Sequence, residues 1–267
     1  MKLNNNIKGI ALGALALTFA SCSNIEEDDR FIDVEVATAK RCVLIEDFTG
    51  QRCVNCPTAT AIIGDIIEQY GHDNIVAVGL YSGPFGNNAG GTKPLPLTTD
   101  EANHLYEKYK VDAQPSGMIN RQGVDPNYES WGATVNAEIQ KDAGLNIEIV
   151  PVYDAVARTA QISVTIDAIY DVDGKLNVWL TEDDIVSPQY IPATGKSDPN
   201  YVHNHVFRKS ITNIDGEAVN VGYGLTKTFD YSIEISDEWV PENMTVVVFV
   251  DNAGGVMQAG KAKLISE

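Results

Sequence analysis

Residues 43–70 read VLIEDFTGQRCVNCPTATAIIGDIIEQY, and this stretch decides the first part of the fold. The apolar run from Val43 to Phe48 predicts a short buried strand. Isoleucines then recur with the i, i+4 spacing of a helix over residues 57–70. Cys53 and Cys56 therefore lie in the turn that joins a strand to the start of a helix.

The alternation of strand and helix patterns continues after this stretch. Apolar runs predict a second strand over residues 75–81 and a helix over residues 100–109. A short strand at residues 118–119 and a last helix around Trp131 follow. This order predicts an α/β domain over residues 41–144, in which helices cover the faces of a mixed sheet.

Residues 145–267 lack helical periodicity and alternate apolar with polar residues. Such runs, with turn signals at Asp173-Gly174 and Gly254-Gly255, predict an all-β, Ig-like sandwich. No cysteine follows Cys56, so we expect a sandwich without an inter-sheet disulfide, separable from the preceding part at about Gly144. The expected strands lie at residues 145–149, 162–168, 176–181, 201–211, 228–235, 245–250 and 256–264.

The spacing of Cys53 and Cys56 places both sulfur atoms on one side of a helix, where they can bond to each other. The helix N-terminus stabilises a thiolate at Cys53, and Arg52 adds a neighbouring cation. We therefore expect Cys53, nearer to solvent, to be the attacking thiolate and Cys56 to be the resolving thiol. A static disulfide is one alternative, although a loop this small constrains the unfolded chain little. A zinc site is another, but the pair supplies only two of the four ligands that structural zinc needs.

The residues around the pair resemble the thioredoxin family. Asp47-Phe48 match the buried acid and the aromatic residue that precede the cysteine pair in that family. Residues 111–116, VDAQPS, resemble the loop that holds the family's cis-proline. This resemblance implies that Asp47 assists proton transfer at Cys56 and that Pro115 shapes the groove for an extended substrate.

Two positions depart from the thioredoxin pattern. Arg52 stands where thioredoxins carry an aromatic residue, and Val54-Asn55 replaces their Gly-Pro between the cysteines. Both changes act on the redox potential, so the potential does not follow from the resemblance.

A wider resemblance covers nearly all of residues 40–265. Residues 49–57, TGQRCVNCP, and residues 201–206, YVHNHV, are similar to the outer membrane protein 28 family of bacterial lipoproteins. This resemblance implies an outer-membrane lipoprotein with a thioredoxin-like domain and a C-terminal Ig-like sandwich. The family name states no molecular activity.

Residues 1–21 have the pattern of an export signal. Two lysines precede the apolar residues 10–19, and this run is too short to span a bilayer, which takes about 20 residues. Residues 19–22, FASC, resemble a lipobox, so we expect a lipoprotein signal peptide and an acylated Cys22 at the mature N-terminus. An ordinary secretory signal with a chance cysteine is the alternative.

The acidic residues 22–40 are expected to form a solvated tether. The whole chain of 267 residues carries a formal net charge of −18, which argues against a nucleic-acid partner. The expected partners are the membrane, through the N-terminal lipid, and exported proteins as substrates. We expect a position on the outer membrane, at its periplasmic or surface-exposed face, and neither a cofactor nor a metal.

Three further side chains have an open role. His203 and His205 alternate with Val202, Asn204 and Val206 and are expected on one face of a strand, where they could bind a metal or form hydrogen bonds at an interface. Cys42 would lie about 20 Å from the cysteine turn if the intervening strand is extended. Because this exceeds disulfide reach, we expect Cys42 to be a buried free thiol.

The sequence supports two functions. The leading hypothesis is thiol–disulfide exchange on exported proteins, with Cys53, Cys56, Asp47 and Pro115 at the site. The alternative is a non-enzymatic surface binding or adhesion module that keeps a thioredoxin scaffold and meets its partner through the sandwich or the Gly/Pro-rich residues 82–99.

Overall fold

The computed structural model describes residues 40–86 and 97–265. The expected signal peptide, Cys22 and nearly all of the acidic tether lie outside the described residues, as does the middle of residues 82–99. The described residues belong to one compact unit. No helix within the described ranges is both long and apolar enough to cross a bilayer.

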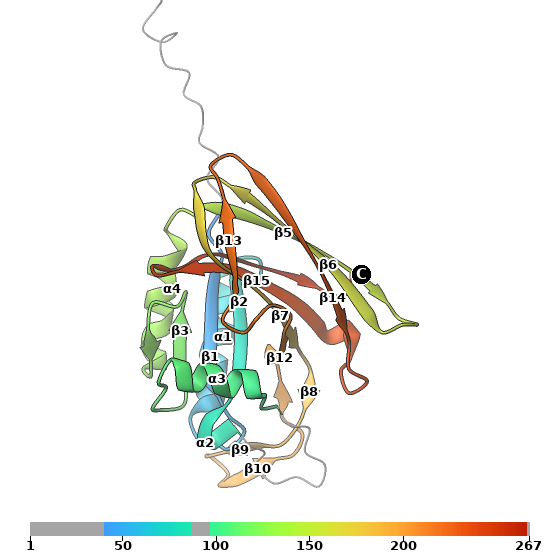
Figure 1. Ribbon diagram of the computed structural model, residues 1–267. Helices are drawn as coiled ribbons and strands as arrows, with labels where there is room; N and C mark the ends of the chain where they lie inside the picture. Colours follow the sequence, from blue (N-terminus) through green and yellow to red (C-terminus); the bar gives the residue numbers. More distant parts are fainter. Residues whose placement is uncertain (1–39, 87–96, 266–267) are drawn as a thin grey trace, which may run out of the picture. The chain divides into compact units, whose positions relative to one another are not determined.

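The largest element is a nine-stranded mixed sheet (Figure 1). The pairs β1–β2 and β2–β12 are parallel, and the other pairs are antiparallel. In sheet order the strands are β16 (Gly255–Lys263), β15 (Met244–Asn252), β7 (Val172–Glu182), β12 (Val206–Ser210), β2 (Ile75–Tyr81), β1 (Val43–Thr49), β3 (Ser116–Ile119) and β4 (Val124–Asp125), with β13 (Glu217–Val221) also paired to β7.

Helices cover both faces of β1 and β2. Alternate residues of each strand point to opposite faces, so Ile45 packs against α1 and α4, whereas Leu44 packs toward α3. The structure confirms the strands predicted over residues 43–48 and 75–81, and it confirms the three predicted helices. The helices are α1 (Cys56–Tyr70), α2 (Gly83–Gly86), α3 (Asp100–Lys108) and α4 (Trp131–Ile139), with short 3-10 turns η2 (Tyr128–Ser130) and η3 (Pro241–Asn243).

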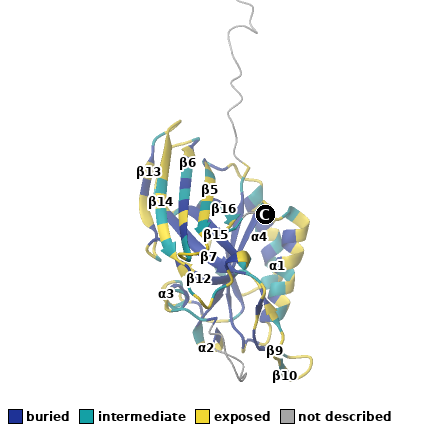
Figure 2. Ribbon diagram, turned by 90° about the vertical axis from the view of Figure 1, so that its right-hand side faces the viewer, coloured by how far each residue is buried: buried dark blue, intermediate teal, exposed yellow. Residues whose placement is uncertain are grey.

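A second sheet of three antiparallel strands packs against one face of β7 and β15. Its order is β14 (Thr226–Glu234), β6 (Thr159–Ala168) and β5 (Leu145–Asp154). The strands expected over residues 145–149, 162–168 and 228–235 correspond to β5, β6 and β14. The period-two pattern arises because alternate residues of β6, such as Ile162 and Val164, are buried. Figure 2 shows the buried strands of the large sheet behind these partly exposed ones. The fold is therefore mostly β, with a mixed sheet.

The large sheet contains strands from both sides of position 144. β12 joins β2 through the register pair Val206 and Gly79, and Trp179 and Phe249 pack in one core with Leu44. The separability of residues 145–267 as an Ig-like domain stays a prediction.

Two local predictions are wrong. Asp173-Gly174 is not a turn but lies inside β7, where a side chain at Gly174 would come within 2.5 Å of the Asp251 carbonyl oxygen. The strand expected over 201–211 is broken, because His205 has a φ of 57°. It forms β11 (Val202–His203) and β12, and β8 (Ile185–Val186), β9 (Gln189–Ile191) and β10 (Lys196–Asp198) were not predicted.

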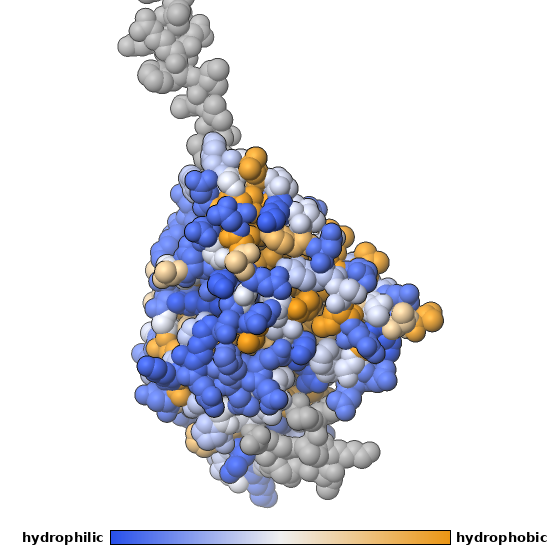
Figure 3. All heavy atoms as spheres, in the orientation of Figure 1, coloured by the Kyte–Doolittle hydropathy of each residue, from blue (hydrophilic) through white to orange (hydrophobic). Residues whose placement is uncertain are grey.

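Exposed apolar side chains belong mainly to the second part of the chain. Val150, Val152, Val156 and Leu225 are exposed on the three-stranded sheet and its turns. On the face shown in Figure 3, hydrophilic side chains dominate around α3, and apolar ones are scattered toward the three-stranded sheet.

Candidate functional site

Cys53 and Cys56 form a disulfide in the turn between β1 and α1. The helix begins at Cys56, with Asn55 at the N-cap and Pro57 in the first turn, where a missing N–H costs nothing. The Cys56 backbone N–H donates to Cys53 Sγ at 3.2 Å. Cys53 itself precedes the helix, and its own N–H donates to the Gly50 carbonyl oxygen at 3.0 Å.

Both cysteines are buried. Cys53 and Cys56 are each 1% exposed, whereas Arg52, Val54 and Asn55 around them are exposed. The prediction that Cys53 stands nearer to solvent is therefore wrong. Sequence reasoning considered only the turn itself and not the distant segment that lies against it.

That distant segment is residues 187–191, named here the strap, which includes β9. The Gln189 side chain donates to the Gly50 carbonyl oxygen at 3.4 Å and to the Cys53 carbonyl oxygen at 3.3 Å. The backbone N–H of Tyr190 donates to the Gln51 carbonyl oxygen at 2.8 Å. The cysteine turn is thus held by a segment more than a hundred residues away in the sequence.

Gln51 completes this attachment from the other side. Its side-chain amide is fully buried and donates to Ser187 Oγ and to the Pro188 carbonyl oxygen, each at 2.8 Å. Hydrogen bonds away from water therefore join the turn to the strap, which makes opening them costly, although Gln51 Oε1 has no partner among the described residues.

Asp47 lies on β1 beside the first turns of α1. Its Oδ1 has no hydrogen-bond partner among the described residues, and the carboxyl lines a cavity of about 130 Å³ with Thr60 and Tyr81. Thr60 is one turn after Cys56 on the same side of the helix. Burial raises the pKa of Asp47 to about 7, and a hydrogen bond with Thr49 opposes the rise.

Pro115 lies at the same end of β1. The Gln114–Pro115 peptide bond is cis, and Pro115 is buried just before β3, whose Ser116 pairs with Phe48. The Gln114 side chain donates to the Thr49 carbonyl oxygen at 2.7 Å and ties this loop to the end of β1. Asp47, the cysteine turn and Pro115 thus all lie near the C-terminal end of β1.

Sequence reasoning singled out His203 but missed its partner, Tyr81. The two rings are joined by a 2.7 Å contact between Tyr81 Oη and His203 Nδ1, and His203 Nε2 lies 3.1 Å from the Ser187 carbonyl oxygen. Because a carbonyl only accepts, Nε2 donates and Nδ1 accepts from the tyrosine. Burial lowers the pKa of His203 to about 4, so this ring is neutral at pH 7.

His205 does not share a face with His203, so that prediction is wrong. The strand break turns His205 toward Asp183, with Nδ1 3.1 Å from Oδ1. Within residues 40–86 and 97–265, no group of three or more His, Cys, Asp or Glu side chains is placed to hold a metal ion. Cys42 is a buried free thiol as predicted, and burial raises its pKa to about 12.

Solved structures share this fold at low sequence identity. HBP35 of Porphyromonas gingivalis matches with a TM-score of 0.66 and 15% identity, over 84% of this chain and 76% of its own. A protein from Agrobacterium tumefaciens matches with a TM-score of 0.54 and 16% identity, over 86% of this chain and 98% of its own. At these identities the likeness establishes the fold alone.

Comparison at the sequence level identifies the family. No curated protein matches the chain. A domain of the outer membrane lipoprotein Omp28 from Porphyromonas gingivalis is 19% identical over 46% of this chain and 88% of its own, but its TM-score is only 0.33. The family model described as outer membrane protein Omp28 matches residues 102–267, a segment that begins after the cysteine pair. The chain therefore belongs to the outer membrane protein Omp28 family.

Proposed function

We propose that this protein is a thiol–disulfide exchange protein of the cell envelope, with a thioredoxin-like site in residues 41–144. One observation carries the proposal: the Cys53–Cys56 disulfide lies at the N-terminus of α1, and beside that helix is the buried carboxyl of Asp47, whose Oδ1 has no hydrogen-bond partner among the described residues. A disulfide of this loop size adds little stability, and a carboxyl with a pKa of about 7 can accept and return a proton near neutral pH.

The exchange runs in two balanced steps when the pair is reduced. The Cys53 thiolate attacks a substrate disulfide, a mixed disulfide forms, and one substrate sulfur leaves as a thiolate. Asp47 then takes the proton of Cys56, whose thiolate attacks Cys53 and releases the second substrate sulfur. The products are a substrate dithiol and the Cys53–Cys56 disulfide, and oxidation of a substrate dithiol is the reverse sequence.

The substrates we propose are exported proteins with disulfides or thiols, met at the edge formed by Pro115 and the cysteine turn. Because both cysteines are 1% exposed, exchange requires the strap to move away from the turn. Local opening of this kind costs less than global unfolding, since the strap is held by a few hydrogen bonds at an edge of the fold.

The decisive experiment is the redox equilibrium of the folded protein. In glutathione buffers, mass-tag alkylation should show Cys53 and Cys56 converting together between two thiols and one disulfide, with Cys42 unlabelled. Cys53→Ser should abolish exchange with a disulfide substrate, and Cys42→Ser is the matched control that should retain it. A disulfide that strong reductants open only when the protein unfolds would refute the proposal.

A specific observation favours a second function. Both sulfurs are enclosed and the strap is bonded to their turn, which also suits a static disulfide in a non-enzymatic surface binding or adhesion module. The same equilibrium separates the two functions, because an inert pair in the folded protein supports the binding module.

The attachment to the membrane is also a proposal. Residues 19–22, FASC, place Cys22 where an acylated cysteine would anchor the chain to the outer membrane. Cys22→Ser should move the protein from the membrane fraction to the soluble fraction. A variant that stays with the membrane would show that the lipid is not the anchor.

A further inference from the structure

A second cavity, of about 630 Å³, lies where the two parts of the large sheet diverge. β12 and β2 are joined by the single register pair Val206 and Gly79, and Ala77, two residues earlier on β2, already lines the cavity. Its volume is within the range of small-molecule sites, roughly 300–1,000 Å³. The proposed thiol chemistry makes no use of this space.

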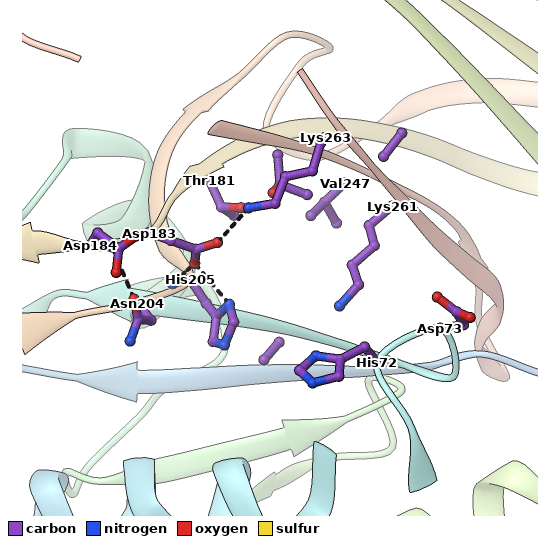
Figure 4. Close-up of a pocket in the computed structure, with 13 residues that line it drawn as sticks. His72, Asp73, Thr181, Asp183, Asp184, Asn204, His205, Val247, Lys261 and Lys263 are labelled. Carbon is purple, nitrogen blue, oxygen red and sulfur yellow. Dashed lines mark hydrogen bonds and ion pairs between the residues drawn. The ribbon is translucent and has the colours of Figure 1, made fainter. Parts of the chain in front are cut away.

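Lys261 of β16 extends into this cavity (Figure 4). Its Nζ donates to the Ile75 carbonyl oxygen at 3.0 Å. No carboxylate of residues 40–86 or 97–265 lies within salt-bridge distance of it. An ammonium group has three N–H donors, so two stay available to a ligand. Lys261 is half-buried, and this burial lowers its pKa because the charged form is partly removed from water.

Two imidazoles face the same space. His72 follows α1, and in Figure 4 its ring and that of His205 lie below the end of Lys261. Asp183 fixes the His205 ring, because its carboxylate accepts from the backbone N–H at 2.7 Å and lies 3.1 Å from Nδ1. Nε2 of His205 is thereby left for a ligand.

The carboxylate of Asp183 is already neutralised within the protein. Lys263 lies 3.0 Å from its second oxygen. Burial raises the pKa of Asp183, but the contacts with His205 and Lys263 outweigh it and lower the pKa overall. Asp73 and Asp184 also line the cavity and limit the negative charge that a ligand can carry.

We propose that this cavity binds a small organic molecule through a single carboxylate group. The carboxylate accepts hydrogen bonds from Lys261, from the His72 imidazole and, when the His205 ring carries both protons, from His205 Nε2, and its carbon chain contacts Ala77 and Val247. A doubly charged phosphate is disfavoured, because three aspartates line the same cavity.

The four histidines of the chain provide the test. His72 and His205 line the cavity. His104 of α3 instead pairs with Asp215, and the His203 ring contacts Tyr81 Oη. Titration with butyrate, followed by the ring Cε1–H signals in NMR, should shift those of His72 and His205 and leave the other two in place. No shift, equal shifts of all four signals, or stronger shifts with inorganic phosphate would overturn the proposal.

Variants of the lysine sharpen the result. Lys261→Gln should weaken butyrate binding about tenfold or more, since a hydrogen bond to a charged group is lost. Lys261→Arg keeps the charge and should keep most of the affinity. Lys175→Gln, an exposed lysine outside the cavity, is the matched control and should change nothing. A native His203 signal would show that Lys261→Gln is folded. If this folded variant binds butyrate with unchanged affinity, the proposal is also overturned.

Discussion

The core between the two sheets and the region around β1 bury their residues in different ways. The inter-sheet core consists of apolar side chains from residues 145–264, such as Val164 and Val248. The β1 region instead buries two neighbouring carboxyl groups, those of Glu46 and Asp47, which are 0% and 4% exposed. Burial of apolar side chains stabilises the inter-sheet core. Burial of a carboxyl group instead costs free energy of folding, and such groups are typically found where they pair with a cation or take part in chemistry.

The two buried carboxyl groups of β1 differ in their partners. Glu46 is paired with Arg121 at 3.0 Å, and Arg121 also binds Asp251 of β15 at 3.0 Å, so this cluster joins the first part of the chain to the second. Asp47 has no ionic partner and faces a cavity. The paired group is a structural joint, and the unpaired group is the candidate for proton transfer.

The largest effect is expected from breaking that joint. Arg121→Ala leaves Glu46 as an uncompensated buried charge, which typically lowers the free energy of unfolding by about 3–5 kcal/mol. Urea unfolding measures the loss. The exposed Arg52→Ala should stay within about 0.5 kcal/mol of the wild type. A loss below about 1 kcal/mol for Arg121→Ala would mean that the cluster does not join the two parts.

The unpaired carboxyl predicts a pH dependence of stability. The pKa of Asp47 is raised in the folded protein, so its proton is bound more tightly there than in the unfolded chain. Its contribution is therefore fully present below about pH 4 and is lost as the pH rises through about 7. With a pKa of about 7 in the folded protein, protonated Asp47 contributes at most about 4 kcal/mol to the free energy of unfolding.

Asp47→Asn cannot ionise and should remove that loss. We expect the variant to be more stable than the wild type at pH 8 and the difference to shrink toward pH 4, as measured by urea unfolding across this range. Asp65→Asn, on the exposed side of α1, is the control and should show no such trend. An Asp47 variant that is equally stable at every pH would contradict a raised pKa.

A smaller effect is expected at the strap. Gln189→Ala removes its hydrogen bonds to Gly50 and Cys53, and each is worth about 1 kcal/mol. Reduction of the disulfide by dithiothreitol should become up to about thirtyfold faster, the factor that corresponds to about 2 kcal/mol. Gln69→Ala, exposed on α1, is the control. An unchanged rate would show that the strap does not limit access to the sulfurs.

The smallest effect is expected from the local cation beside the pair. Arg52 is exposed, and salt screens exposed charges. Arg52→Ala should therefore raise the pKa of reduced Cys53 by only a few tenths of a unit, as read from the pH dependence of alkylation with mass mapping. Preferential labelling of Cys56 would reverse the roles assigned to the two cysteines.

Local sequence patterns were sufficient for the elements around the site. The strand before Cys53, the helix after it and the strand over 75–81 follow from periodicity and from the positions of Pro57 and Gly71. The pattern failed at His205, where a positive φ breaks a run that alternates like a strand. Period-two alternation records which side chains face a core, and it does not record backbone conformation at a single residue.

The sequence by itself therefore determined the elements around the site, the cysteine pair and the buried free thiol of Cys42, because each depends on residues close together in the chain. Only the tertiary structure decided that the strap lies against the cysteine turn, that β12 extends the sheet at β2, and that Lys261 enters a cavity beside His205. The partners Gln189 and Cys53, Val206 and Gly79, and Lys261 and Ile75 are each more than a hundred positions apart in the chain. Pairing at that distance is selected by the packing of the whole core, which no local spacing encodes.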